Sequence, residues 1–257
     1  MKQAPAAPVV SIRGLSRRFG ALQALTGIDL DVGAGEVLAL CGDNGAGKST
    51  LIRILAGAEL PSAGEIRLNG EPVVFRSPQE ALARGVAAIY QDLALAPRLS
   101  IRENVFMGAE LTRPVLLPFI RLLDRHAMAR EARELLARLE VRIDDVERPV
   151  ESLSGGQRQA VAIARALRSR ASLIIMDEPT AALGVRESAQ VLELIVRLRD
   201  AGHSVILISH NMRDVAQVAS RVVILKGGRK IGDRPVAGLT ADDLRRLIFE
   251  ASWADAA

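Results

Sequence analysis

Residues 42–49 read GDNGAGKS and combine the residue types that can hold a chain of phosphate groups. Glycines let successive backbone N–H groups turn toward phosphate oxygens, a lysine amine reaches the terminal phosphates, and a serine hydroxyl can bind magnesium. We therefore predict that Lys48 contacts the terminal phosphates and that Ser49 is a magnesium ligand. The residues assigned to this phosphate site are Gly42, Asp43, Asn44, Gly45, Ala46, Gly47, Lys48, Ser49 and Thr50.

Two acidic residues end an apolar run further along the chain, where residues 173–178 read LIIMDE. Ligands gather at the carboxyl ends of the strands of a parallel sheet, so Asp177 and Glu178 are expected beside the phosphate loop. Asp177 is then a candidate magnesium ligand, and Glu178 a candidate group to polarise an attacking water. Taken alone, the same pair could be an acidic end of a surface strand.

A second glycine turn precedes a helical pattern at residues 153–157, which read LSGGQ. A turn of this kind before a helix has the shape of a phosphate cradle, because the first N–H groups of a helix lack partners within it. It contains no lysine, however, and it lies far along the chain from the lysine-bearing loop. The alternative interpretation is a turn that only caps the helix.

The elements that must position these residues alternate between strands and helices. The loop at 42–49 has a buried-strand pattern before it (37–41) and a helical pattern after it that stops at Gly57. Further strands are expected at 9–15, 27–32, 172–178, 203–209 and 221–228, a hairpin at 64–73, and helices at 124–141 and 186–202. Strand signals vanish from about residue 92 to 150, where we expect a helical insertion. This pattern predicts an α/β protein with a parallel sheet that is covered on both faces.

Composition limits the class of protein. The 257 residues are 49% hydrophobic and 25% charged, which is typical of a globular chain. The formal net charge is +4 with acids and bases interspersed, so nucleic acid is not an expected partner. No apolar run is long enough to span a membrane, and the single cysteine, Cys41, fits buried packing in a reducing compartment. We expect the chain to remain in the cytoplasm.

With these motifs in this order, the chain resembles the ATP-binding subunits of ABC transporters. The resemblance adds a glutamine in IYQD (89–92) and a histidine in LISH (207–210), and it covers nearly the whole sequence. It implies a P-loop ATPase with a mainly parallel core sheet, a small antiparallel part and a helical subdomain at about 92–165, all within a single domain over 1–257. It also implies ATP and Mg²⁺ as cofactors.

The resemblance assigns further roles residue by residue. Gln91 matches the glutamine that touches magnesium, and His210 matches the histidine that contacts the γ-phosphate. Phe19, in RRFG, matches the aromatic residue that stacks on adenine, although a lone phenylalanine is also often a core residue. His126 and His203, in contrast, lie in helical or turn contexts and are expected to be solvated.

In this family, the LSGGQ turn of one subunit closes over ATP held by another, which implies an ATP-dependent dimer of this chain. The residues carried over to this contact are Ser154, Gly155, Gly156 and Gln157. The further partners implied are a membrane permease and, indirectly, a solute-binding protein, with the chain at the cytoplasmic face of the inner membrane. An aspartate common after DEPTAAL is replaced here by Gly184.

Several longer stretches resemble the ATPases of bacterial monosaccharide importers of the ribose, xylose and fructose type. They are 42–57, 89–108 and 177–188. The function implied is ATP hydrolysis that drives monosaccharide import. The alternatives are a subunit for another solute, an exporter subunit, or a soluble ABC ATPase that acts on nucleic acid or ribosomes. The cargo itself is not encoded in these residues.

Overall fold

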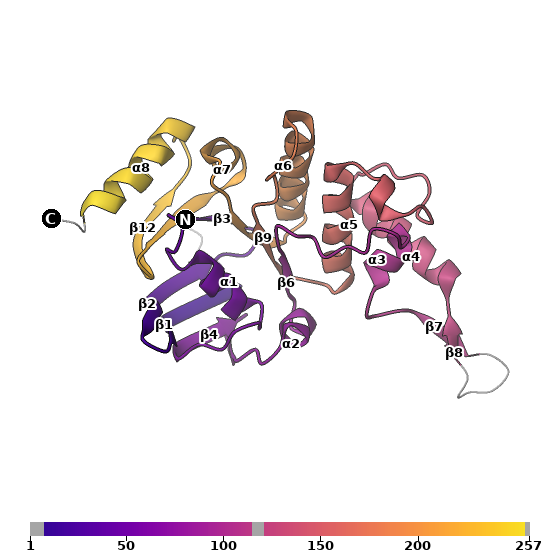
Figure 1. Cartoon of the computed structure of the whole chain (residues 1–257), viewed down its shortest axis with the longest axis horizontal. Coiled ribbons are helices and arrows are strands. Elements are labelled where there is room, and N and C mark those ends of the chain that lie inside the picture. The colour runs from indigo at the N-terminus through magenta and orange to yellow at the C-terminus, as the bar shows by residue number, and fades with distance from the viewer. Residues whose placement is uncertain (1–7, 115–120, 255–257) are drawn as a thin grey trace, which may run out of the picture.

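The computed structural model describes residues 8–114 and 121–254. Figure 1 shows a group of helices at one end of the molecule, the C-terminal helix at the other, and two sheets between them. Within the described residues no helix is both long and apolar enough to cross a membrane.

A six-stranded sheet forms the centre of the fold. Its order is β12 (Arg229–Pro235), β11 (Arg221–Lys226), β3 (Val37–Cys41), β10 (Ser204–Ile208), β9 (Leu173–Asp177) and β6 (Val86–Ile89). All neighbours are parallel except β12, which is antiparallel to β11. The strands expected at 37–41, 172–178, 203–209 and 221–228 are confirmed, whereas β6 and β12 were not predicted.

The two faces of this sheet meet different layers. Every residue of β3 is buried, and alternate residues point to opposite faces. Leu38 and Leu40 pack in a cluster with α1 (Lys48–Leu55) and the second sheet, whereas Ala39 and Cys41 pack toward α7 (Met212–Val218) and α8 (Ala241–Ala254). The sheet is covered on both faces as expected, but a second sheet supplies much of the cover on one of them.

That second sheet is antiparallel. Its order is β2 (Leu22–Val32), β1 (Val10–Phe19), β4 (Ala63–Leu68) and β5 (Glu71–Val73). The predicted hairpin is confirmed, because β4 and β5 pair across Asn69 and Gly70, whose φ angles are 51° and 84°. Two positive φ angles are the signature of a two-residue turn that suits the twist of a hairpin.

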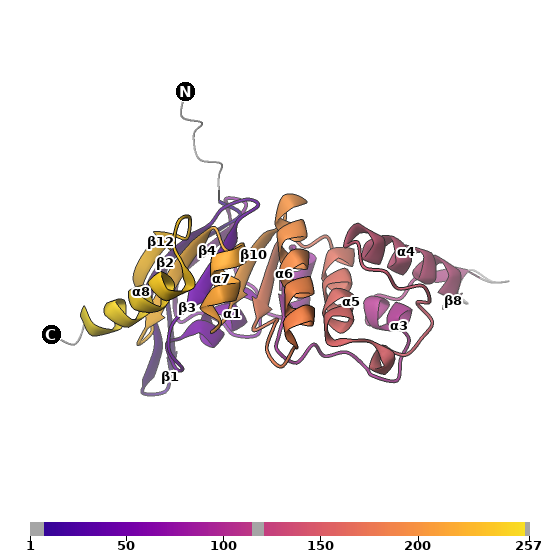
Figure 2. The same ribbon diagram turned by 90° about the horizontal axis from the view of Figure 1, so that it is seen from above.

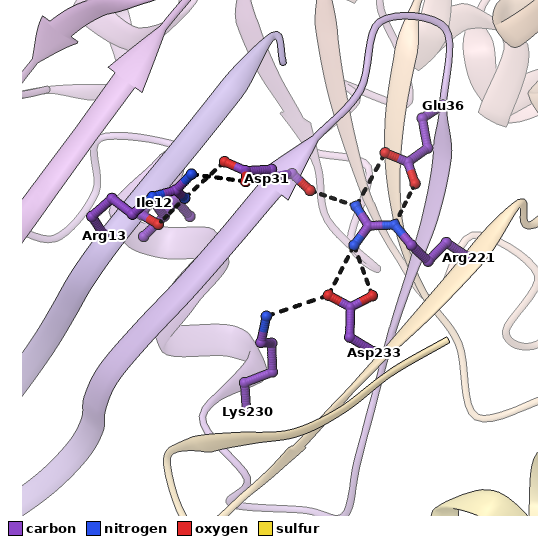
Figure 3. Close-up of polar contacts among 7 residues, drawn as sticks. All are labelled: Ile12, Arg13, Asp31, Glu36, Arg221, Lys230 and Asp233. Carbon is purple, nitrogen blue, oxygen red and sulfur yellow. Dashed lines mark hydrogen bonds and ion pairs between the residues drawn. The ribbon is translucent and has the colours of Figure 1, made fainter. Parts of the chain in front are cut away.

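Arg221 joins the two sheets (Figure 3). From the start of β11 its guanidinium donates to Glu36 at 2.7 Å and to Asp233 of β12 at 2.8 Å. It also donates to the backbone carbonyl of Asp31 in β2. The hydrogen bonds that the guanidinium donates to these carboxylates, first of all to Glu36, raise the pKa of Arg221. Arg13 in turn binds the side chain of Asp31, so the polar contacts continue into β1.

Helices cover the other face of the central sheet. Figure 2 shows α5 (Gly155–Arg168), α6 (Val185–Asp200), α7 and α8 in a row. The remaining helices are α2 (Pro78–Ala83), α3 (Ile101–Phe106), α4 (Arg125–Arg138) and the short 3₁₀ turn Val150–Ser152. The helix after the phosphate loop is confirmed as α1, which is followed by Gly57 at φ 72°.

The segment expected to be wholly helical also contains strands. Helix α4 is present as predicted, with Asp124 accepting from the Ala127 amide, and its buried face includes Met128 and Leu135. The prediction that this segment contains no strands was wrong, however. Thr112–Pro114 (β7) and Arg121–Leu123 (β8) pair as an antiparallel ribbon. These strands have three residues each, and none of these residues is buried, so no buried alternation marks them in the sequence.

Candidate functional site

The phosphate loop joins β3 to α1 and needs glycine at its two ends. Gly42 has φ 143°, and a Cβ there would lie 2.1 Å from the carbonyl oxygen of Leu225. Gly47 has φ 103°, and a Cβ there would lie 2.7 Å from a methyl of Leu25. No other residue fits both the backbone angles and the neighbouring atoms. The loop is therefore held close against β11 and the second sheet.

Lys48 is the first residue of α1, and its side chain folds back over the loop. The Nζ atom donates to the carbonyl oxygens of Gly42 at 2.6 Å and Asp43 at 2.9 Å. The residue is buried, with 7% of its surface exposed, and burial lowers the pKa of its amine. A fixed cation at the start of a helix is well placed to receive phosphate oxygens.

Asp177 and Glu178 lie at the carboxyl end of β9, as predicted. Burial, followed by the charge of Glu178, raises the pKa of Asp177. Glu178 adopts φ 49°, a left-handed conformation that is uncommon for a residue with a side chain, and its N–H donates to the carbonyl of Ile208 in β10. This backbone arrangement turns the Glu178 carboxylate toward the segment that follows β10.

His210, two residues after the end of β10, closes the site from the neighbouring strand. Its Nε2 atom lies 3.0 Å from Oε1 of Glu178. The His210 side chain is half exposed, whereas Glu178 is 29% exposed. The pair can therefore be reached by a ligand that lies over the loop.

One pocket of about 520 Å³ brings most of the predicted residues together. The predicted residues in its wall are Phe19, Asn44, Gly45, Ala46, Gly47, Lys48, Ser49, Thr50, Gln91, Asp177, Glu178 and His210. Gly42 and Asp43 are not in the wall, although their carbonyls hold Lys48. Ser49, Gln91 and Asp177 contribute oxygen atoms of the kinds that Mg²⁺ prefers, so this donor set fits a magnesium ion shared with phosphates.

The rim of this pocket includes residues that sequence reasoning did not find. They are Leu22, Gln23, Ala24, Ile208 and Gly227. Ile208 lies within LISH but has no role assigned to it there. No motif marks the other four, because they reach the pocket through the pairing of β1 with β2 and through the turn after β11.

Phe19 lies at the rim of the pocket and not in the core. It is 38% exposed, and the guanidinium carbon of Arg17 lies 4.4 Å from the centre of its ring. A cation over one ring face is a favourable contact that helps to fix the ring. An exposed, fixed ring at the mouth of a pocket can serve as a stacking surface.

The LSGGQ turn does not enter this pocket. Ser154 caps α5 by accepting from the Gln157 amide, and the Gln157 side chain accepts from the Ser154 amide. Gly155 instead lines a separate cavity of about 290 Å³, whose wall also includes Gln91 and Glu178. Within one chain, the two glycine turns therefore remain apart.

The Gly155 amide has a partner that sequence reasoning missed. It donates to Oε1 of Glu187 in the first turn of α6 at 2.9 Å. The Gly156 amide, in contrast, has no acceptor among the described residues. The spacing of Gly184 and Glu187 fits a capping box, but Gly184 lacks the side chain that usually makes this pattern recognisable.

The histidines outside the site differ from each other. His126 is exposed, but His203 is half-buried, and its Nδ1 lies 2.8 Å from the carbonyl of Ala171. The expectation that His203 is solvated was therefore wrong. His203 directly precedes β10, at the end of the sheet opposite the candidate site. The sequence there indicates only a turn before the strand.

Comparison with known proteins gives consistent matches. The family model described as ABC transporter matches residues 25–181. The chain is 50% identical over 226 residues to the fructose import ATP-binding protein FrcA of Rhizobium meliloti, covering 87% of each chain. It is 45% identical over 223 residues to the xylose/arabinose import ATP-binding protein XylG of Sulfolobus acidocaldarius, covering 87% of this chain and 86% of the relative.

Longer relatives and solved structures extend these matches. The chain is 44% identical over 245 residues to the ribose import ATP-binding protein RbsA 1 of Rubrobacter xylanophilus, and it spans about half (48%) of that protein. The fold matches MJ1267, an ATP-binding cassette of an ABC transporter, with a TM-score of 0.82 at 23% identity, covering 96% of this chain and 99% of that one. It also matches a bacterial ABC transporter cassette, MJ0796, described as dimeric, with a TM-score of 0.70 at 25% identity, covering 90% of this chain and all of that one.

Proposed function

Because this chain belongs to the ABC transporter family, as an ATP-binding protein of that family, we propose that it hydrolyses ATP to drive monosaccharide import across the cytoplasmic membrane. The proposed ATPase activity rests on one pocket, whose wall contains Lys48, Asp177, Glu178 and His210. The relatives named for fructose and for xylose and arabinose import, both of similar length, support a monosaccharide as the cargo.

In the proposed chemistry, the triphosphate lies along residues 42–50 and Phe19 stacks on the adenine. The loop amides and Lys48 receive the phosphate oxygens. Ser49, Gln91 and Asp177 would hold a magnesium ion, which when bound neutralises phosphate charge. Glu178 orients the attacking water, and His210, 3.0 Å from it, contacts the γ-phosphate.

A second copy of the chain would complete this site. The turn at Ser154–Gln157 lies outside the pocket of its own chain, and the Gly156 amide is free of acceptors among the described residues. An N–H at the start of the 14-residue helix α5 attracts an anion without a lysine. We infer that Ser154, Gly155, Gly156 and Gln157 of one copy close over ATP bound to the other, in an ATP-dependent homodimer.

The proposed membrane partner is a permease that docks beside Gln91. An apolar groove of about 390 Å³ runs along β6 to Tyr90, the residue before Gln91, and its wall contains Leu82, Met107 and Ala162. Because this groove adjoins the loop that carries Gln91, a permease segment within it would sense changes at the ATP pocket. The chain would then be a peripheral protein of the cytoplasmic face, with a solute-binding protein as an indirect partner and no nucleic acid partner.

The domain organisation follows from this assignment. We propose one nucleotide-binding domain over residues 1–257, with a helical subdomain at about 92–165 that moves when ATP binds. Helices α3, α4 and α5 pack together at the end of the molecule farthest from α8, which supports a subdomain there (Figure 1).

Gentle extraction and co-purification test the proposed assembly. The tagged chain should bring down a multi-spanning permease and a solute-binding protein, and the ligand of that binding protein should be a monosaccharide. A different ligand would contradict the proposed monosaccharide cargo. Ribosomes or DNA-bound proteins in place of a permease would contradict the proposed transport function. ATP hydrolysis is measured on the same preparation. If it persists when no permease is found, only the transport function is contradicted and the ATPase function stands.

A further inference from the structure

Arg165 in α5 holds the loop that carries Gln91. One terminal nitrogen of its guanidinium donates to the carbonyl oxygen of Ala94 at 3.0 Å, and the other donates to that of Leu93 at 2.9 Å. Gln91 itself forms no hydrogen bond among the described residues. Following the chain from Gln91, the first hydrogen bonds that come from outside the loop are therefore those of Arg165.

The guanidinium of Arg165 has these two carbonyls as its acceptors. The residue is half-buried, and burial, followed by the charge of Arg168, lowers its pKa. It forms no ion pair within the part of the chain that the structure describes. A planar guanidinium presents its donors in a fixed fork, so two bonds to adjacent carbonyls orient the loop more narrowly than a single bond could. Because the donor is charged and partly shielded from water, these bonds are also strong.

Other contacts hold the later part of the same loop. Leu93 and Leu95 pack against the core cluster that includes the buried face of α5. The side chain of Asn104 in α3 accepts from the N–H of Ala96 and donates to its carbonyl. Loss of the Arg165 hydrogen bonds should therefore free the start of the loop without detaching the rest of it.

Helix α5 connects this contact to the LSGGQ turn. The helix begins at Gly155, and Arg165 lies ten positions later (165 − 155), about 15 Å further along the axis at 1.5 Å per residue. Arg165 is also in the wall of the apolar groove that reaches Tyr90. One side chain therefore joins the Gln91 loop, the helix of the proposed dimer contact and the groove proposed for the permease.

We propose that Arg165 is a positioning residue for ATP hydrolysis: its two hydrogen bonds to the loop keep Gln91 where that side chain can bind magnesium. This inference rests on the function proposed above, in which Gln91 is a magnesium ligand. Because Gln91 and the LSGGQ turn are then attached to one helix, a movement of α5 toward a partner copy carries Gln91 with it. A permease segment in the groove meets the same guanidinium, which connects it to the magnesium ligands.

A fluorescent ATP analogue measures nucleotide binding and magnesium binding separately. Its affinity is determined without Mg²⁺, and Mg²⁺ is then titrated into the complex with protein in excess. The variants are Arg165→Gln, Gln91→Ala and the double variant. Arg168→Gln is the matched control, because it removes the same charge on the same helix, and its guanidinium donates to the carbonyl of Val105 and not to the loop. Melting curves check folding, and Arg165→Lys, which keeps the charge without the fork, takes the place of Arg165→Gln if that variant does not fold.

We expect Arg165→Gln to need about tenfold more Mg²⁺ for half-saturation, as is usual when a group that orients a metal ligand is lost. Nucleotide affinity without Mg²⁺ should stay as it is, because Lys48 and its loop are unchanged. Removal of a positive charge would by itself strengthen Mg²⁺ binding, so simple electrostatics predicts a shift in the opposite direction. The control should not weaken Mg²⁺ binding. In the double variant the two shifts should not add, because Arg165 acts through Gln91.

Three results would overturn the positioning role alone, provided that Gln91→Ala raises the Mg²⁺ requirement. They are an unchanged requirement in Arg165→Gln, additive shifts in the double variant, and an equal loss of nucleotide affinity without Mg²⁺, which would show that Arg165 only supports the fold. If Gln91→Ala leaves the Mg²⁺ requirement unchanged, Gln91 is not a magnesium ligand, and the positioning role fails with it. ATP hydrolysis by the natural protein, measured in parallel, shows whether the proposed ATPase function still stands.

Discussion

The imidazole Nε2 of His210 lies 3.0 Å from the Oε1 atom of Glu178, across the carboxyl ends of two adjacent parallel strands. The N–H of Glu178 also donates to the carbonyl of Ile208, so a backbone hydrogen bond joins the ends of the two strands. The two side chains come from different motifs, 32 positions apart by their numbers (210 − 178), and meet because β9 and β10 are neighbours. The site therefore depends on strand order as much as on the residues themselves.

Replacing Glu178 with Gln should lower the rate of ATP hydrolysis by about 10²- to 10⁴-fold, because a positioned base for the attacking water is lost. Nucleotide binding should persist, since Lys48 and the loop are unchanged. Phosphate release and fluorescent-nucleotide binding measure the two effects. Undiminished turnover in this variant would remove Glu178 from the chemistry. Glu193→Gln, an exposed acid on α6, is the control.

Replacing His210 with Ala should lower turnover by about 10²-fold, which is typical for loss of one group that bears transition-state charge. Because the side chain is half exposed, the folded state should be little affected. The checks are steady-state kinetics and a melting curve. His126→Ala, at an exposed histidine of α4, should leave the rate as it is, and an equal loss in both variants would contradict a specific role.

Gly42→Ala should destabilise the protein strongly, by about 3 kcal/mol or more, because the new Cβ would lie 2.1 Å from the Leu225 carbonyl oxygen. Gly45→Ala is the matched comparison: its φ is also positive, at 81°, but a Cβ there meets nothing within 4 Å. That variant should lose only about 1–2 kcal/mol, the cost of the left-handed conformation. Denaturant unfolding of both variants tests the difference, and equal losses would contradict the described contact.

Arg221→Ala should lower the free energy of unfolding by about 2–4 kcal/mol, because it leaves Glu36, whose side chain is 15% exposed, without its cation. The link between the two sheets through the Asp31 carbonyl is lost at the same time. Arg245→Ala removes an exposed ion pair with Asp242 and should change stability by less than about 1 kcal/mol. Similar losses in the two variants would show that the Arg221 contacts contribute no more than a surface pair.

Asp31 should contribute to stability in a pH-dependent way. The hydrogen bond from Arg13 lowers the pKa of its carboxyl group from the ordinary 3.8. A lowered pKa means that the folded state favours the ionised form, so the contribution is present above pH 3.8 and is lost as the pH falls through the lowered pKa. The difference in unfolding free energy between the natural protein and Asp31→Asn should shrink below pH 4. It should be small throughout, because the pair is half exposed.

The sequence predicts the P-loop, its strand and its helix because local motifs specify them. The position of the acidic pair at 177–178 beside the P-loop is predicted because the carboxyl ends of parallel strands lie at the same edge of a sheet. In contrast, β6 and β12 are short or partly exposed, and neither follows a distinct hydrophobic pattern. No residue of the ribbon formed by β7 and β8 is buried, so hydrophobic periodicity could not reveal it.

The contact between Glu187 and Gly155 marks the limit of sequence reasoning for the site. The two residues are 32 positions apart and come together through the packing of α5 against α6. The motif around Gly155 suggests a free amide for phosphate, and only the three-dimensional arrangement shows that a carboxylate already accepts from it. A tertiary contact of this kind has no periodicity or spacing that a sequence pattern can expose.

Mixing two inactive variants tests whether two copies of the chain complete each other's ATP sites. Lys48→Ala disables the loop of one copy, and Ser154→Glu blocks the LSGGQ turn of another at an exposed position. Each variant alone should be inactive, but mixed copies form heterodimers in which one site carries both defects and the other carries none. We predict that an equal mixture regains about a quarter of the ATPase activity of the natural protein, since half of the dimers would have one intact site. A mixture no more active than its two components would contradict sites shared between copies.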